Sequence, residues 1–152
     1  MLEELESKCT DAAIGRLVSR ALYGLLRDDF QLLSNDAAER TIAAALMVQL
    51  AKAFPKWNVD VEYNKMGDAA KKVAWNENPA LVYPDVIVHI RGTAKNLLAI
   101  EVKKSSNSAS KDDDVRKLLA YRTDGELAYK HCLFLRLGTG ENAGKIPEFE
   151  WV

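Results

Sequence analysis

Two apolar runs near the middle of the chain decide the fold: Val82-Tyr83-Pro84-Asp85-Val86-Ile87-Val88-His89 and Leu97-Leu98-Ala99-Ile100-Glu101-Val102-Lys103. Both are rich in β-branched and apolar residues, and the polar stretch between them contains a glycine, which is typical of a β-hairpin. If the turn is centred at Thr93, paired residue numbers sum to 186, and Asp85 lies opposite Glu101. Because side chains alternate between the two faces of a strand, Asp85, Glu101 and Lys103 then share one face.

Outward from this hairpin, the spacing of apolar residues predicts helices on both sides and further strands. Apolar residues at three- and four-residue steps indicate helices, and alternating or continuous apolar runs indicate strands. The predicted helices cover residues 11–30, with Thr10 as N-cap, then 36–54 and 112–121. The predicted strands cover residues 57–63, 81–90, 97–102, 131–137 and 146–151, the last at a sheet edge, and residues 64–80 form a partly helical connection. This order predicts an α+β fold, an α/β sandwich with a mixed sheet.

Composition favours one ordinary globular domain covering residues 1–152. The chain is 48% hydrophobic and 28% charged, which excludes a disordered or collagen-like chain. The two cysteines fit no metal spacing and indicate buried thiols in a reducing cytoplasm. The first residues are acidic and the longest uncharged stretch is short, so we expect neither a targeting signal nor a membrane span, and a cytoplasmic location.

The pair of carboxylates across the hairpin points to chemistry. Two carboxylates placed opposite each other repel, so Asp85 and Glu101 need a cation between them. Lys103 supplies part of that charge, and a hard divalent ion with oxygen ligands would supply more.

These residues resemble the PD-(D/E)XK nuclease superfamily, which has the restriction-endonuclease-like fold. Pro84-Asp85 resembles its first motif element, and Glu101-Val102-Lys103 resembles its second. The helix, three strands, helix and strand from residue 36 to residue 137 resemble its αβββαβ core, preceded by a helical extension over residues 1–35. The pair Glu62-Tyr63, which ends the first strand, is similar to that of small prokaryotic members.

The resemblance implies a Mg²⁺- or Mn²⁺-dependent nuclease that hydrolyses phosphodiester bonds, with DNA as the expected substrate. Asp85, Glu101 and the backbone carbonyl of Val102 would bind the metal ion, and Lys103 would orient the attacking water or stabilise the phosphorus centre. Glu39 matches an acid that the family often carries on the helix before the first strand. Glu62 is a weaker second-shell candidate of the same cluster.

Each assignment has a structural alternative. Asp85 is also placed to accept a backbone N–H after Pro84, and Glu101 with Lys103 also fits a solvated strand face bearing an ion pair. Glu39 lies in line with the apolar residues of its helix, but Asp36-x-x-Glu39 also fits a capping box. Glu62 also fits an outward-facing strand position.

Local charge favours a polyanion near the motif. Residues 103–122 carry six bases and three acids, a charge of +3, whereas residues 1–36 carry four bases and seven acids, a charge of −3. We therefore expect Lys104, Lys111 and Lys117 to contact nucleic acid.

Two other functions remain open. One is a catalytically silent nuclease-fold module that binds DNA or a protein partner, and the other is a helix-on-sheet interaction domain whose resemblance is accidental. The broad apolar face of the helix at residues 11–30 also suggests a homodimer through the N-terminal helices.

Overall fold

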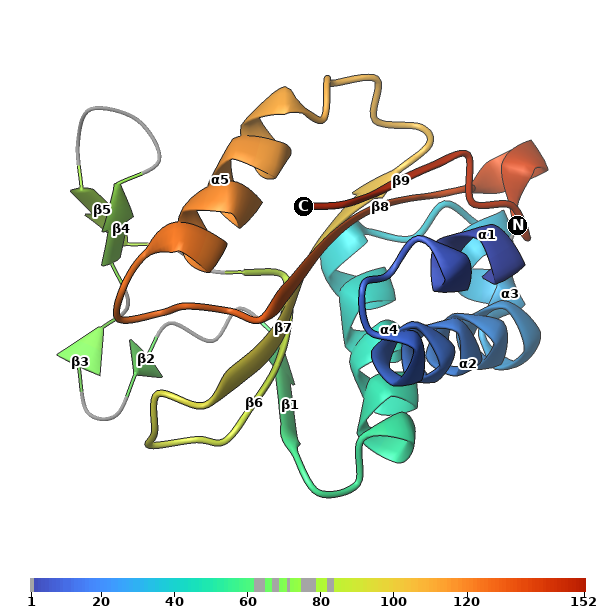
Figure 1. The fold of residues 1–152 in the computed structure, drawn as a ribbon. Helices are drawn as coiled ribbons and strands as arrows, with labels where there is room; N and C mark the ends of the chain where they lie inside the picture. The colour runs from blue at the N-terminus through green and yellow to red at the C-terminus, as the bar shows by residue number, and fades with distance from the viewer. Residues whose placement is uncertain (1, 62–64, 67–68, 71, 75–78, 82–83) are drawn as a thin grey trace.

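A computed structural model describes residues 2–61, 65–66, 69–70, 72–74, 79–81 and 84–152. Its centre is an open, mixed five-stranded sheet with the strand order β1-β6-β7-β8-β9 (Figure 1). The strands of this sheet are β1 (Asn58–Val61), β6 (Val86–His89), β7 (Asn96–Lys104), β8 (His131–Leu137) and β9 (Glu148–Trp151). Strands β7 and β8 are parallel, and the other neighbours are antiparallel. The predicted α+β class with a mixed sheet is confirmed.

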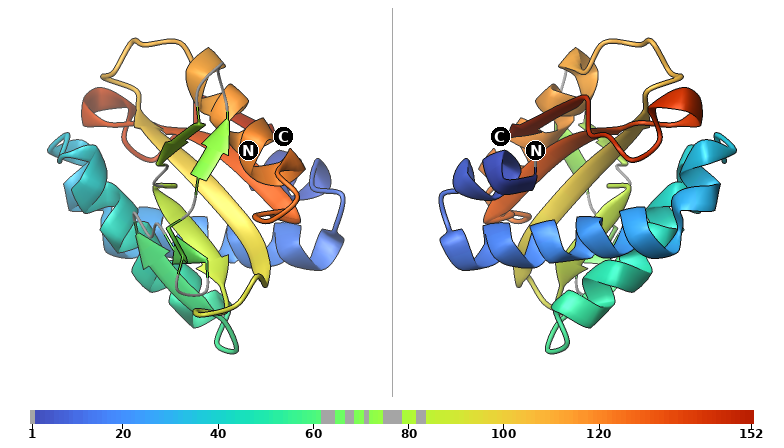
Figure 2. Two further views of the ribbon diagram at one scale, coloured as in Figure 1. Left: turned by 90° about the vertical axis from the view of Figure 1, so that its left-hand side faces the viewer. Right: turned by 90° about the vertical axis from the view of Figure 1, so that its right-hand side faces the viewer.

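Helices cover both faces of the sheet (Figures 1 and 2). On one side, α4 (Glu39–Ala53) packs on the strands, and α1 (Leu2–Ser7), α2 (Ala12–Asp28) and α3 (Phe30–Ser34) lie beyond it. On the other side lies α5 (Asp112–Thr123). The alternation of β-strand side chains divides the core accordingly. Val86 and Ile100 join the cluster with α4, whereas Ile87 and Ala99 join Leu118 of α5.

The first helix differs in its start from the prediction. Helix α2 begins at Ala12, and its N-cap is Asp11, not Thr10, because an Asp11 carboxylate oxygen accepts the N–H groups of Ala13 and Ile14. Its apolar residues Val18, Leu22 and Leu25 are fully buried in the chain's own core, and Leu17 and Leu26 are partly buried against it. Most of the apolar face that suggested a homodimer therefore packs within the chain, and the homodimer stays a prediction.

The connection after β1 is not helical where the structure describes it. It contains the short strands β2 (Lys65–Met66), β3 (Ala69–Ala70), β4 (Lys72–Ala74) and β5 (Pro79–Leu81), so the prediction of a partly helical segment is wrong there. These strands pair as β2 with β3 and β4 with β5. Each of these strands is only two or three residues long, which is too short for the sequence to show a period of alternating apolar residues. Glu62 and Trp75 lie outside the described residues.

The elements predicted at residues 36–54, 97–102, 112–121, 131–137 and 146–151 agree with α4, β7, α5, β8 and β9 within three residues. The strand predicted at residues 81–90 differs, because β6 begins only at Val86, and the helices α1 and α3 were not predicted individually. Strand β8 covers the predicted residues, and β9 is an edge strand as expected. Both cysteines, Cys9 and Cys132, are buried free thiols. Within the described residues, no helix has the length and apolar character needed to cross a membrane.

Candidate active site

The β6–β7 hairpin has the register that the sequence predicts. Val86 pairs with Ile100 and Val88 with Leu98, and the register shifts only beyond Val88. The pairing places Asp85, directly before β6, against Glu101 on β7. Asp85 Oδ2 accepts the backbone N–H of Val102 at 2.7 Å. The sequence analysis gave acceptance of a backbone N–H as the alternative role of Asp85. The structure shows such a hydrogen bond, with the donor on the neighbouring strand β7.

Glu101 is buried, with an exposed fraction of only 5%. Its Oε1 accepts the hydroxyl of Tyr121 from α5 at 3.2 Å. Burial, and then the neighbouring charge of Asp85, raise the pKa of Glu101 well above its usual value. The alternative of a solvated strand face is therefore wrong for Glu101.

Asp85 and Glu101 form one coupled pair of carboxyl groups. Burial raises the pKa of Asp85 as well, and the two side chains lie within hydrogen-bonding range of each other. Such a pair carries its second negative charge only at a cost in free energy. A cation bound beside the pair would remove that cost.

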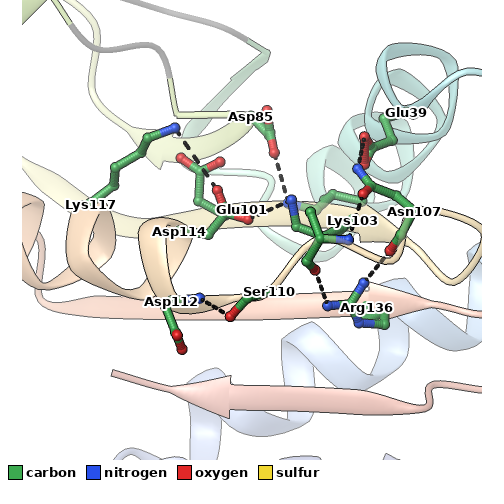
Figure 3. A network of polar contacts seen from close by, with 12 residues as sticks. Glu39, Asp85, Glu101, Lys103, Asn107, Ser110, Asp112, Asp114, Lys117 and Arg136 are labelled. Atoms are coloured by element: carbon green, nitrogen blue, oxygen red, sulfur yellow. Dashed lines mark hydrogen bonds and ion pairs between the residues drawn. The ribbon is translucent and has the colours of Figure 1, made fainter.

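Lys103 shares the face of Glu101 and points to α5 (Figure 3). Its Nζ lies 3.0 Å from Asp114 Oδ2, and Lys117 Nζ lies 3.9 Å from the other oxygen of the same carboxylate. Asp114 also adds to the negative field at Asp85 and Glu101. Asp114 is thus a third acid beside the site, and it was not among the site residues that the sequence predicts.

The sequence did contain a signal for Asp114. It lies three residues before Lys117, so both side chains occupy one side of a helix. The polar loop before α5 is short, so this side of the helix lies beside the end of β7, where Asp114 contacts Lys103. Tyr121, one helical turn after Lys117, lies on the same side of α5 and contacts Glu101. The sequence analysis did not name it as a site residue.

Glu39 connects the start of α4 to the end of β7. Its Oε2 accepts the backbone N–H of Lys104 at 3.2 Å, and its Oε1 accepts Asn107 Nδ2 at 3.4 Å. The capping-box alternative is wrong, because the N-cap of α4 is Ala38 and no side chain caps this helix. Asp36 instead accepts the hydroxyl of Ser106.

The three lysines proposed to contact nucleic acid are all ion-paired. Lys104 Nζ lies 3.3 Å from Asp36 Oδ1, and Lys117 pairs with Asp114. Lys111 Nζ lies 3.1 Å from Glu148 and 2.9 Å from Glu150 on β9. Their positive charges are therefore compensated locally, although each ammonium group remains partly exposed.

The oxygen donors fit a hard divalent cation. Asp85 and Glu101 are carboxyl groups whose mutual repulsion such an ion relieves, and Mg²⁺ commonly binds one or two carboxylates and completes its shell with water or phosphate oxygens. Across the part of the chain that the structure describes, no three His, Cys, Asp or Glu side chains form a metal-sized cluster. Glu39 is therefore not joined with Asp85 and Glu101 into a three-acid group.

The chain was also compared with protein-family models, with curated protein sequences and with solved structures, and none of them matched. Only the chemistry and geometry of these side chains therefore indicate a function.

Proposed function

We propose that this protein is a Mg²⁺- or Mn²⁺-dependent nuclease with a restriction-endonuclease-like core, acting on DNA. The observation that carries the proposal is a pair of facing carboxyl groups, the buried Glu101 on β7 and the half-buried Asp85 directly before β6, with Lys103 on the same face as Glu101. Two facing carboxyl groups cost free energy when both are ionised, so this arrangement favours a functional role.

The order of elements supports the proposed core. Helix α4, strands β1, β6 and β7, helix α5 and strand β8 follow one another in the order of the αβββαβ core, with β2 to β5 inserted after β1. In the sheet, β6 and β7 are neighbours and β7 is parallel to β8. Helices α1 to α3, within residues 2–35, form the helical layer outside this core.

In this function Asp85, Glu101 and the Val102 carbonyl would hold the metal ion. When bound, the ion would lower the pKa of a coordinated water and neutralise charge on the phosphate. Lys103 would carry a compact positive charge to a phosphate oxygen or to the attacking water. Tyr121 holds Glu101 through its hydroxyl, and Asp114 holds Lys103.

A second candidate, a catalytically silent module that binds DNA or a protein partner, is favoured by the ion pairs. Lys103 is paired with Asp114, and the basic residues around the site are paired with acids. Catalysis would need the charge of Lys103 at the phosphate, whereas a binding module would not. Neutralisation of this charge by Asp114 therefore fits a binding module.

Calorimetric titration with Mn²⁺ and Mg²⁺ separates these candidates without a known substrate. We expect millimolar or tighter binding to the wild type and loss of binding in Asp85→Asn. Asp113→Asn is the matched control, because Asp113 is an exposed acid on α5 that pairs with Arg116. Absence of binding in the wild type would favour the silent module, and equal binding in wild type and Asp85→Asn would exclude Asp85 as a ligand.

A further inference from the structure

A groove of about 240 Å³ lies on the helical layer, between α2 and α4, and none of its lining residues belongs to the candidate active site. Its rim contains Arg20, Tyr23 and Arg27 from α2 and Lys52 from α4. The two helices approach closely here because residue 24 is glycine, and a Cβ at this position would collide with the side chain of Gln49.

The groove carries an excess of positive charge. Arg27 donates to Asp28 through two nitrogens, and Gln49 donates to the same carboxylate, so the pKa of Asp28 is lowered to about 2. Among the described residues, no carboxylate lies within ion-pairing distance of Arg20 or Lys52. Three cations and one acid thus surround the groove.

The positive residues of α2 form a stripe along one side of the helix. Arg16, Arg20, Tyr23 and Arg27 follow one another at steps of four, three and four residues, and all four are exposed. The acids of residues 1–36 lie before and after this helical stretch, at positions 3–11 and 28–36. The overall charge of −3 for that region therefore conceals a basic helix face.

We propose that this groove binds the phosphate backbone of a nucleic acid strand, as a second contact surface of the protein. Arginine presents planar donors that fit phosphate oxygens, and the side chain of Tyr23 is 57% exposed beside them. An exposed aromatic ring between cations is the combination that binds single strands, because bases stack on the ring while phosphates contact the cations. The guanidinium carbon of Arg27 lies 5.8 Å from the centre of the Tyr23 ring, so a base on this ring would stack beside a cation, whereas an acidic peptide would use the cations without the ring.

The inference rests on the proposed function only in that the protein's ligand is a nucleic acid. It is tested by fluorescence anisotropy with a labelled 20-nucleotide single strand in EDTA, which removes cleavage from the measurement. We expect Arg20→Ala/Lys52→Ala to weaken binding at least about tenfold and to reduce the salt slope by about 1.4, since each lost phosphate contact on a single strand removes roughly 0.7.

Two further variants separate charge and stacking. Tyr23→Leu should weaken binding at least about fivefold and leave the salt slope unchanged, because stacking is worth about 1 kcal/mol or more per base. Lys8→Ala/Lys145→Ala removes two other exposed cations and should bind as the wild type does. All these side chains are exposed, so none of the substitutions should disturb folding.

The outcomes distinguish the groove from the nuclease site. Wild-type-like binding by Arg20→Ala/Lys52→Ala, or no binding by the wild type, would overturn the groove proposal, whatever a separate cleavage assay in Mn²⁺ shows. Displacement of the oligonucleotide by polyglutamate at equal charge would also overturn it, in favour of an acidic peptide ligand. Groove-dependent binding by a protein that does not cleave in Mn²⁺ would support the groove and contradict the nuclease.

Discussion

Lys103 Nζ lies 3.0 Å from Asp114 Oδ2, and both side chains are only 14% exposed. This contact joins β7 to α5 beside the coupled carboxyl groups Asp85 and Glu101. It makes the lysine of the motif part of a structural ion pair before any substrate binds. Five predictions test this site and the contacts around it.

The ion pair should be energetically coupled. In a double-mutant cycle of Lys103→Met and Asp114→Asn, we expect a coupling free energy of about 1–2 kcal/mol, because each single variant leaves a mostly buried polar group without its main partner. Urea denaturation of the four proteins measures it. A cycle that closes within about 0.3 kcal/mol would mean that the pair contributes nothing to stability.

Loss of the motif residues should abolish cleavage. Asp85→Asn and Lys103→Ala should each reduce nuclease activity at least about 100-fold, because each removes charge that would act at the phosphate. Circular dichroism should show that both variants remain folded, and Asp113→Asn provides the active control. Cleavage by either variant at the wild-type rate would show that the site lies elsewhere.

The carboxyl group of Glu101 should lower the free energy of unfolding, compared with an amide at the same position. Glu101→Gln keeps the shape of the side chain, and it removes one of two facing carboxyl groups whose burial raises their pKa values. We therefore expect it to be more stable than the wild type at pH 7, by on the order of 1 kcal/mol. Thermal denaturation measures this, with the exposed Glu126→Gln as an unchanged control. A less stable Glu101→Gln would show that the carboxylate has a structural role.

Asp60 should make stability depend on pH in the acid range. It accepts hydrogen bonds from the buried ring of His89 and from Arg91, and although burial alone would raise its pKa, these donors hold the pKa below its usual 3.8. Its ionised form is thus favoured in the folded state, so its stabilising contribution is present above about pH 4 and is lost as the pH falls through the lower folded pKa.

The variant Asp60→Asn tests this dependence. It should be about 1–2 kcal/mol less stable than the wild type at pH 7, because it loses charge-assisted hydrogen bonds. The difference should decrease below pH 4 in urea denaturation series. A constant difference between pH 7 and pH 2.5 would contradict the argument.

Arg136 should hold the serine-rich loop after β7. Its guanidinium donates to the backbone carbonyls of Asn107 and Ala109 at 2.6 and 2.9 Å, and to Glu148 at 3.0 Å. Arg136→Met should cost about 2–3 kcal/mol and should make residues 105–110 more sensitive to limited proteolysis, since two carbonyls lose a charged donor. Arg116→Met, which removes an exposed pair with Asp113, should leave both properties unchanged.

The sequence by itself determined the hairpin and its register. Two apolar runs form β6 and β7, and the length of the polar turn between them sets the register from Val86 to Val88. The facing of Asp85 and Glu101 follows from that local pattern. The helices and β8 were predictable for the same reason, because their periodicity lies in contiguous residues.

Only the tertiary structure decided the partners of these side chains. A strand pattern shows that Glu101 lies on one face, but its burial depends on where α5 packs and on the hydroxyl of Tyr121. The pairing of Lys103 with Asp114 and the groove beside Gly24 likewise arise where separate elements meet. Such contacts depend on the packing of whole helices and sheets, and no local period in the sequence encodes them.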